Sequence, residues 1–244
     1  MPLKNLNTEQ YNSATSNIGY NLTIASAGTG KTSTIVGRIA HLLQNGTAPE
    51  RILLLTFTNK AASEMIGRVA SYFNEEIASK IMAGTFHSVS YKIMKNMDLP
   101  IVLKQPSELK TLFKSLYEKR IFPQIEEAQH YDGGYLYDIY SLYLNSTYDE
   151  NFETWLMDRN SAHKPFVMIY EDLFEEFNKI KQEYGYVNFD DLLLKMLEIQ
   201  NENQFDFYEI LVDEYQDTNP LQGKLLEGFK PKSLFCVGDY DQSI

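Results

Sequence analysis

Cysteine is nearly absent from this 244-residue sequence: Cys236 is the only one, so no disulfide can form within the chain. Its position inside an apolar run is typical of a small core side chain, and the lack of disulfides fits a reducing compartment. Long apolar runs are missing too, because no stretch approaches the ~18 residues of a membrane-spanning helix. Segment 1–8 also lacks the apolar core of a signal peptide. We therefore expect a soluble, cytoplasmic protein without a membrane partner.

Positive charge is scarce as well. The chain has 22 Lys and Arg against 33 Asp and Glu, and its formal net charge of −11 argues by itself against a nucleic-acid partner. The distribution is uneven, however, since residues 1–97 carry a net charge of +4 and residues 98–244 a net charge of −15. The acidic excess therefore counts against a broad electrostatic DNA-binding surface only in the second part of the chain.

The chain is organised around the segment Ala25-Ser26-Ala27-Gly28-Thr29-Gly30-Lys31-Thr32. Leu22 to Ala25 suits a short strand before it, and the apolar residues of Ser33 to Leu43 recur at helical spacing after it. A strand, a small-residue turn and a helix are the context of a phosphate-binding loop. Backbone N–H groups then face the anion, Lys31 reaches the β- and γ-phosphates, and Thr32 binds Mg²⁺. The strict pattern begins with Gly where this chain has Ala25, and a Gly-rich turn can also be a plain strand-to-helix connection.

Two further buried strands are predicted, each followed by a polar segment that begins a helix. The run Arg51 to Phe57 is apolar without alternation, which is typical of a parallel sheet covered on both faces, and Ile81 to Phe86 repeats the pattern. Loops at the carboxyl ends of such strands carry ligand contacts, so the residues from Thr56 to Lys60 could stack a base and hold a phosphate. A capped helix start explains them equally well. His87 has no spaced His or Cys partners that would make it a metal ligand.

Strand–helix alternation stops near Asp98, and helical patterns dominate up to about residue 186. Segment 126–160 is acidic and rich in tyrosine, and packing or a protein interface is favoured there over base stacking. Five basic residues surround the helix predicted from Pro106, and a solvated surface is favoured for them over contact with nucleic acid; they are Lys104, Lys110, Lys114, Lys119 and Arg120. We therefore interpret 98–186 as a mostly helical insertion into an α/β domain made of 1–97 and 187–244.

The α/β pattern resumes with Asn188, a candidate helix N-cap, and with a strand from Phe207 to Val212 that ends on Asp213-Glu214. Two carboxylates directly after a buried strand are costly unless a cation or another partner satisfies them. Beside a phosphate-binding loop they have a use, since Asp213 can hold Mg²⁺ and Glu214 can deprotonate an attacking water. After a last strand, Ser233 to Val237, only a polar segment remains, so we expect this chain to be the first part of a longer protein.

Seven short segments, in this order along the chain, closely resemble the motifs of superfamily 1 DNA helicases of the UvrD/Rep/PcrA-like branch. They are Leu6–Gln10, Ala25–Thr32, Thr56–Met65, Ala83–Ser88, Phe189–Leu193, Asp213–Gln222 and Gly238–Ile244. In that family the phosphate-binding loop begins with Ala, which accounts for Ala25. The resemblance is strong over 1–97 and 187–244 and faint over the insertion. It implies an α/β fold: a RecA-like P-loop NTPase domain, with a parallel sheet covered by helices on both faces, plus a mostly helical inserted subdomain.

The resemblance also implies roles for individual residues. Catalytic roles are implied for Lys31, Asp213, Glu214 and Gln242, with Gln242 sensing the γ-phosphate, and Mg²⁺ would be held by Thr32 and Asp213. Gln10 would read the adenine edge, Arg38 would flank the adenine, and Gln216 would couple the ATP state to the DNA track. Contacts with ATP are implied for Gln10, Ala25, Ser26, Ala27, Gly28, Thr29, Gly30, Lys31, Thr32, Ser33 and Arg38. Contacts with single-stranded DNA are implied for Thr56, Phe57, Asn59, Lys60, Thr85, Phe86 and His87.

Taken together, the resemblance implies the N-terminal ATPase portion of an ATP-dependent DNA helicase. Such a protein would use ATP and Mg²⁺ to move 3′–5′ on single-stranded or partly duplex DNA in repair, replication or recombination. Family members have a second RecA-like domain, missing from this chain, that completes the ATP site, so this chain alone is expected to hydrolyse ATP poorly. Two alternatives remain open: the motor part of an AddA/RecB-type helicase–nuclease, and a nucleotide-gated binding module that does not translocate.

Overall fold

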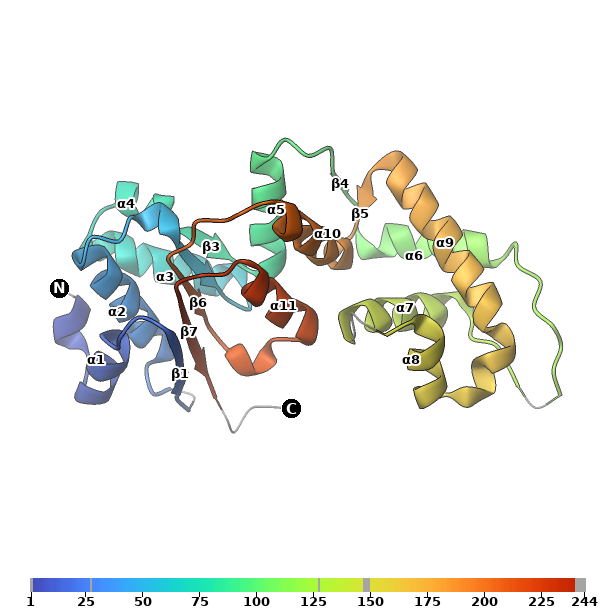
Figure 1. Ribbon diagram of the computed structural model, residues 1–244, viewed down its shortest axis with the longest axis horizontal. Coiled ribbons are helices and arrows are strands. Elements are labelled where there is room, and N and C mark those ends of the chain that lie inside the picture. Colours follow the sequence, from blue (N-terminus) through green and yellow to red (C-terminus); the bar gives the residue numbers. More distant parts are fainter. Residues whose placement is uncertain (1, 27, 127, 147–149, 240–244) are drawn as a thin grey trace. The chain divides into compact units, whose positions relative to one another are not determined.

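The computed structural model describes residues 2–26, 28–126, 128–146 and 150–239 (Figure 1). The chain divides into two compact units. Unit 1 consists of residues 1–97, 196–218 and 222–244, and unit 2 of residues 98–195 and 219–221. Each unit has its own hydrophobic core, and each is described by itself below.

Unit 1 is built on a five-stranded parallel sheet with the strand order β1-β7-β6-β2-β3. The strands are β1 (Tyr20–Ile24), β2 (Ile52–Leu55), β3 (Met82–Gly84), β6 (Glu209–Val212) and β7 (Ser233–Gly238). All four residues of β2 and all four of β6 are buried, as the unbroken apolar run of β2 predicted for a strand covered on both faces. The predicted α/β fold with a parallel sheet is therefore confirmed.

Helices cover both faces of this sheet (Figure 1). One core joins α2 and α3 to β2, β6 and β7 through side chains such as Ile39, Met65 and Phe235. The helices of unit 1 are α1 (Thr8–Ala14), α2 (Lys31–Gln44), α3 (Asn59–Tyr72), α4 (Glu75–Lys80), α5 (Phe86–Asn96), the end of α10 (Phe189–Glu202) and most of α11 (Pro220–Gly228). Short 3₁₀ turns lie at η1 (Pro2–Asn5), η2 (Pro49–Arg51) and η4 (Tyr215–Asp217).

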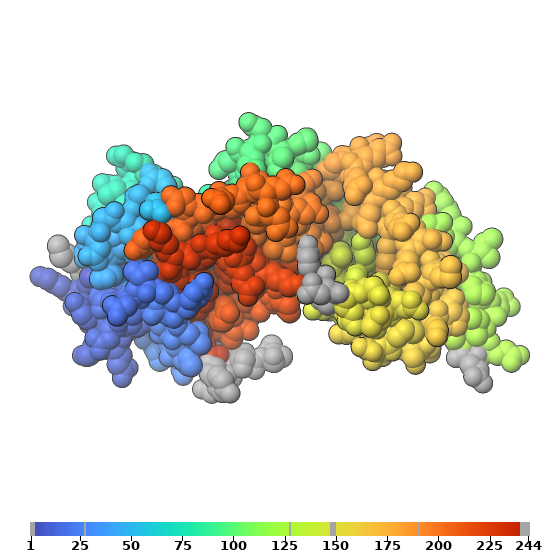
Figure 2. Space-filling view, in the orientation of Figure 1, coloured from blue at the N-terminus to red at the C-terminus, as the bar shows by residue number. Residues whose placement is uncertain are grey.

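The beginning and the end of the described chain meet inside unit 1. Strand β1 pairs with β7 over the register Tyr20↔Leu234 to Ile24↔Gly238. Figure 2 shows the same relationship, because blue atoms from the N-terminal part of unit 1 lie against red atoms from its C-terminal part. Cys236 on β7 is a buried free cysteine, as predicted, and burial raises the pKa of its thiol to about 12, which keeps it protonated and unreactive.

Unit 2 is mostly helical, with an aromatic core that includes Phe113, Trp155, Tyr170 and Phe177. Its helices are α6 (Pro106–Tyr117), α7 (Gly133–Ser146), α8 (Phe152–Arg159), the 3₁₀ turn η3 (Ser161–Phe166) and α9 (Val167–Tyr184). A two-stranded parallel sheet, β4 (Val102–Leu103) with β5 (Tyr186–Val187), was not predicted.

Two groups of residues in unit 2 were considered as possible contacts with nucleic acid, the basic residues around α6 and the tyrosines, and several of them have partners within the protein. Three of the five basic residues around α6 form ion pairs: Lys104 with Glu108, Lys110 with Asp138, and Arg120 with Glu176. Among the tyrosines, Tyr137 and Tyr140 are buried in the core of unit 2, whereas Tyr148 lies outside the described residues.

The return from unit 2 to unit 1 falls at Met196, inside α10, rather than at residue 187. The first turns of α10 are held within unit 2, because Lys181 on α9 forms an ion pair with Asp191 at 2.6 Å. Asn188 caps this helix as expected, since its side-chain oxygen accepts the backbone N–H of Asp191 at 2.7 Å. Among the described helices, none combines the length and the apolarity needed to cross a membrane.

Candidate active site

The glycine-rich loop connects β1 to α2 through two residues in the left-handed region. Gly28 has φ 78° and Gly30 has φ 90°, conformations that favour glycine. Gly30 immediately precedes Lys31, the first residue of α2, so the unpaired N–H groups of the first helical turn face the loop. The loop is closed by Thr29, whose hydroxyl donates to the carbonyl of Ser26 at 2.6 Å. Ala27 lies outside the described residues.

Gln10 reaches this loop from α1. Its side chain forms a capping box with Asn7 and also donates from Nε2 to the carbonyl of Thr29 at 2.8 Å. A Cβ atom on Gly30 would clash with Gln10 Nε2, so a side chain at this position would displace the Gln10 amide from the loop. The Gln10 side chain therefore both completes the N-terminal capping box of α1 and contacts the glycine-rich loop.

The acidic pair follows β6 at the carboxyl edge of the sheet. Asp213 donates its backbone N–H to the carbonyl of Leu55 at 2.9 Å, while its side-chain Oδ1 is buried without a hydrogen-bond partner among the described residues. Burial, reinforced by the charge of Glu214, raises the pKa of Asp213 to about 6. Glu214 has φ 51°, a left-handed conformation that is uncommon for a residue with a side chain and that clusters at functional sites.

Lys31 and Glu214 meet although 183 residues separate them in the sequence. Lys31 Nζ lies 2.6 Å from Glu214 Oε2. Gln216 donates from Nε2 to the same carboxylate oxygen at 3.0 Å, and its Oε1 accepts the backbone N–H of Asp239 at 2.9 Å. Lys31, Glu214, Gln216 and the backbone at the end of β7 are thus joined in one polar network.

The residues present fit a divalent cation held partly by other ligands. Asp213 offers a buried carboxylate oxygen that lacks a partner, and carboxylates are preferred ligands of Mg²⁺. No group of three or more His, Cys, Asp or Glu side chains that could hold a metal occurs in the described part of the chain. A Mg²⁺ ion bound by one or two protein groups, water and phosphate oxygens matches this donor set.

Arg38 does not lie at a nucleotide surface, and its expected place beside the adenine is wrong. Its side chain is completely buried, and the guanidinium forms two hydrogen bonds with the equally buried Glu209, at 2.6 and 2.9 Å. It also donates to the carbonyls of Ala14 and Ser16 and lies over the ring of Phe235. With its donors directed at partners inside unit 1, Arg38 is a structural residue. In the sequence, the position of Arg38 on the same face of the predicted helix as Ile35 and Ile39 was the available indication that it is buried.

The two segments expected to contact DNA lie side by side at the ends of β2 and β3. Asn59 Oδ1 accepts from the hydroxyl of Ser88 at 2.9 Å and from the backbone N–H of Thr85 at 3.4 Å. Ser88 was not assigned a role; its position at the third residue of α5, where it completes a capping box with Thr85, was the available signal.

The side chains in these two segments differ in exposure. Phe57 is 60% exposed, and Asn59 and Lys60 are exposed at the start of α3. Thr56 is only 3% exposed and Phe86 only 9%, so these two side chains pack inside unit 1 and their expected contact with DNA is not supported. His87 is partly buried in the first turn of α5, and Thr85 is the N-cap of that helix.

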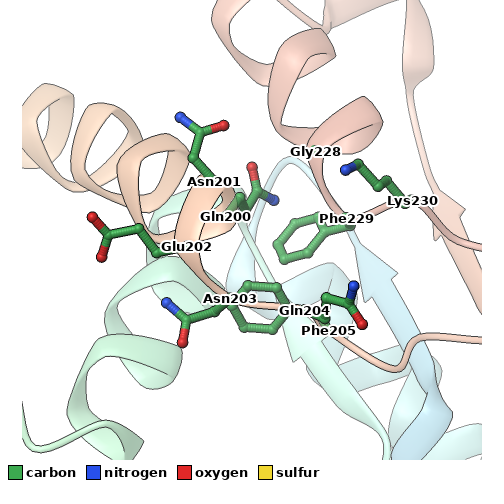
Figure 3. Close-up of a pocket in the computed structure, with 9 residues that line it drawn as sticks. All are labelled: Gln200, Asn201, Glu202, Asn203, Gln204, Phe205, Gly228, Phe229 and Lys230. Carbon is green, nitrogen blue, oxygen red and sulfur yellow. The ribbon is translucent and has the colours of Figure 1, made fainter.

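A cavity of about 430 Å³ lies elsewhere in unit 1 (Figure 3). Residues 200–205 and 228–230 line it, and these segments precede β6 and β7 respectively. It therefore lies toward the opposite edge of the sheet from the loop, and none of the predicted site residues takes part in it. Gln242 lies outside the described residues.

Comparison with known proteins shows the family of this chain. Residues 6–244 match the family model of the UvrD/REP helicase N-terminal domain. The chain is 32% identical to DNA helicase II of Rickettsia typhi, over 98% of this chain and 38% of that protein. It is 30% identical to the ATP-dependent DNA helicase PcrA of Leuconostoc citreum, over 98% of this chain and 33% of that protein. The chain thus spans about a third of the length of the curated relatives it matches. It belongs to the UvrD/REP helicase family and corresponds to the N-terminal domain of its ATP-dependent DNA helicases.

Proposed function

We propose that unit 1 binds and hydrolyses ATP with Mg²⁺ and that it forms part of a 3′–5′ single-strand DNA translocase. The observation that carries this proposal is the 2.6 Å contact between Lys31 and Glu214, beside the unpartnered carboxylate oxygen of Asp213. These three groups are the ones that phosphoryl transfer to water requires: a cation for the phosphates, a general base and a metal ligand. We further propose that unit 2 is a helical subdomain inserted into this ATP-binding domain.

Each side chain has a distinct task in this proposal. The ammonium group of Lys31 exchanges Glu214 for the phosphate oxygens when the nucleotide binds, because several negative oxygens attract it more strongly than one carboxylate does. Glu214 is then free to accept a proton from the attacking water, while Gln216 keeps its carboxylate in place. Asp213 and Thr32 would hold Mg²⁺, which supplies charge neutralisation at the phosphates. Gln10 would exchange its bond to Thr29 for the adenine edge.

The site on this chain is one side of the proposed motor. In this proposal a second RecA-like domain, which this chain does not contain, completes the ATP site, and closing the two domains around ATP drives movement. The 244-residue chain should therefore bind ATP more weakly than the full-length protein and hydrolyse it slowly, with or without DNA.

ATP hydrolysis by the full-length protein, with and without single-stranded DNA, tests this proposal. We expect DNA to stimulate hydrolysis, and Glu214→Gln to reduce the rate by about 10²–10⁴-fold, the usual contribution of a general base. Glu227→Gln, an equally conservative change at an exposed position on α11, is the matched control and should leave the rate unchanged. Hydrolysis that DNA does not stimulate would refute the motor and favour a nucleotide-gated binding module.

A further inference from the structure

A groove of about 650 Å³ follows the outer edge of β3 in unit 1. We call it the β3 groove; α3 and α5 form its walls, and its polar lining includes Asn59, Ser63, Ser88, Lys92 and Asn96. Figure 1 shows β3 between these two helices. Because β3 is the last strand of the sheet, its outer backbone groups face the groove rather than another strand.

The lining of the β3 groove is basic, although the chain as a whole is acidic. It contains Lys80 and Lys92, and none of the described residues that line it is Asp or Glu. Lys80 lies 3.4 Å from Glu76 and 3.9 Å from Glu50, so its charge is partly compensated from outside the groove. Lys92 donates to the neutral carbonyl of Ala83 at 2.9 Å and forms no ion pair with the described carboxylates. Its charge is therefore available to an anion.

The β3 groove begins where the two segments expected to contact DNA meet. Asn59 and Ser88 bond to each other at 2.9 Å, and both line the groove at the carboxyl end of β3, beside Gly84. A Cβ atom on Gly84 would clash with the hydroxyl of Ser88, so a side chain at this position would displace Ser88 or narrow this end of the groove. An anionic chain that crosses Asn59 can continue along β3 toward Lys92.

We propose that the β3 groove holds the sugar–phosphate backbone of single-stranded DNA, with Lys92 as the phosphate contact. This inference rests on the proposed function and extends its DNA path by residues that the helicase resemblance did not include. Lys92 would move from the carbonyl of Ala83 to a phosphate oxygen, because a charge-assisted bond is about twice as strong as one to a neutral acceptor. The released carbonyl lies at an open strand edge, where water can replace the lysine.

The dependence of DNA affinity on salt tests Lys92 specifically. We would measure the binding of fluorescent oligo-dT to the full-length protein by anisotropy over a salt series. Each phosphate contact on a single strand contributes about −0.7 to the slope of log Kobs against log salt, so Lys92→Gln should reduce the slope by about 0.7. Lys92→Arg should preserve it. Lys95→Gln removes the same charge from the same helix, but Lys95 lies against Tyr91 outside the groove, so this control should not change the slope.

The outcomes separate this inference from the proposed function. If Phe57→Ala weakens binding while Lys92→Gln leaves the slope of the wild type, the DNA path is supported and the β3 groove is not part of it. If the wild-type protein does not bind the oligonucleotide, the DNA-binding part of the proposed function fails together with the inference. An unchanged slope combined with capture of an extended peptide along β3 would assign the groove to strand addition by a protein partner instead.

Discussion

Replacement of Arg38 by methionine should strongly destabilise unit 1. Arg38 and Glu209 are both completely buried, and their two hydrogen bonds at 2.6 and 2.9 Å join α2 to the first residue of β6. Methionine keeps most of the volume of the arginine stem but removes its charge and donors. The variant would therefore leave the carboxylate of Glu209 buried without a cation, which costs far more than the loss of an exposed ion pair.

The expected loss is about 3–5 kcal/mol of unfolding free energy, the usual result of removing one partner from a buried pair. For a chain of this size, that corresponds to a fall in Tm of roughly 6–20 °C. Thermal unfolding followed by far-ultraviolet circular dichroism measures it. Arg68→Met is the matched control, because Arg68 forms an ion pair with Glu64 in which both side chains are about half exposed, and it should change Tm by less than about 2 °C.

A double variant shows whether the effect comes from the isolated carboxylate. Arg38→Met combined with Glu209→Met replaces the whole pair by apolar side chains, which is often close to neutral, so it should recover most of the lost Tm. If Arg38→Met unfolds within about 1 kcal/mol of the wild type, the pair contributes little and the reasoning is wrong. A variant of normal stability with weakened ATP binding would restore the role beside the adenine that burial argues against.

Three further predictions concern pH and helix ends. Burial raises the pKa of Asp213 to about 6, so the folded state binds more protons than the unfolded state between about pH 4 and 6, and the ionised carboxylate destabilises the folded state above this range. Asp213→Asn removes this charge, so it should raise Tm at about pH 8, and the gain should vanish near pH 4. Burial lowers the pKa of His163 below 6.5, so the stability of unit 2 should fall as the pH drops from about 6.5, and it should fall less in His163→Gln. The fluorescence of Trp155, the single tryptophan and part of the core of unit 2, measures this unfolding. Lys230, after α11, has φ 49°, a left-handed conformation that favours glycine, so Lys230→Gly should raise the free energy of unfolding in urea by about 0.5–1 kcal/mol. Gly185, after α9, has φ 65°, so Gly185→Ala should lower it by about 1 kcal/mol.

The sequence predicted the candidate site wherever local chemistry decides the outcome. The loop from Gly28 to Lys31 needs left-handed residues followed by a helix start, and both requirements are visible in neighbouring residues. The acidic pair, Asp213 and Glu214, could be recognised in the same way, because it directly follows the apolar residues of β6 in the sequence. Arg38 was misjudged because its partner, Glu209, is 171 residues away and no local pattern indicates that the two side chains meet.

By itself, the sequence predicted the five strands of the unit 1 sheet and the starts of several helices, since hydrophobic periodicity, caps and glycines act over a few residues. It also determined the family, because the seven motifs can be recognised in the sequence without knowledge of the fold. Only the tertiary structure decided the strand order, the burial of Phe86, the pairing of Arg38 with Glu209, the contact of Lys31 with Glu214 and the groove beside β3. These features depend on which distant segments pack together, and the free energy of that packing is a property of the whole core rather than of any one stretch.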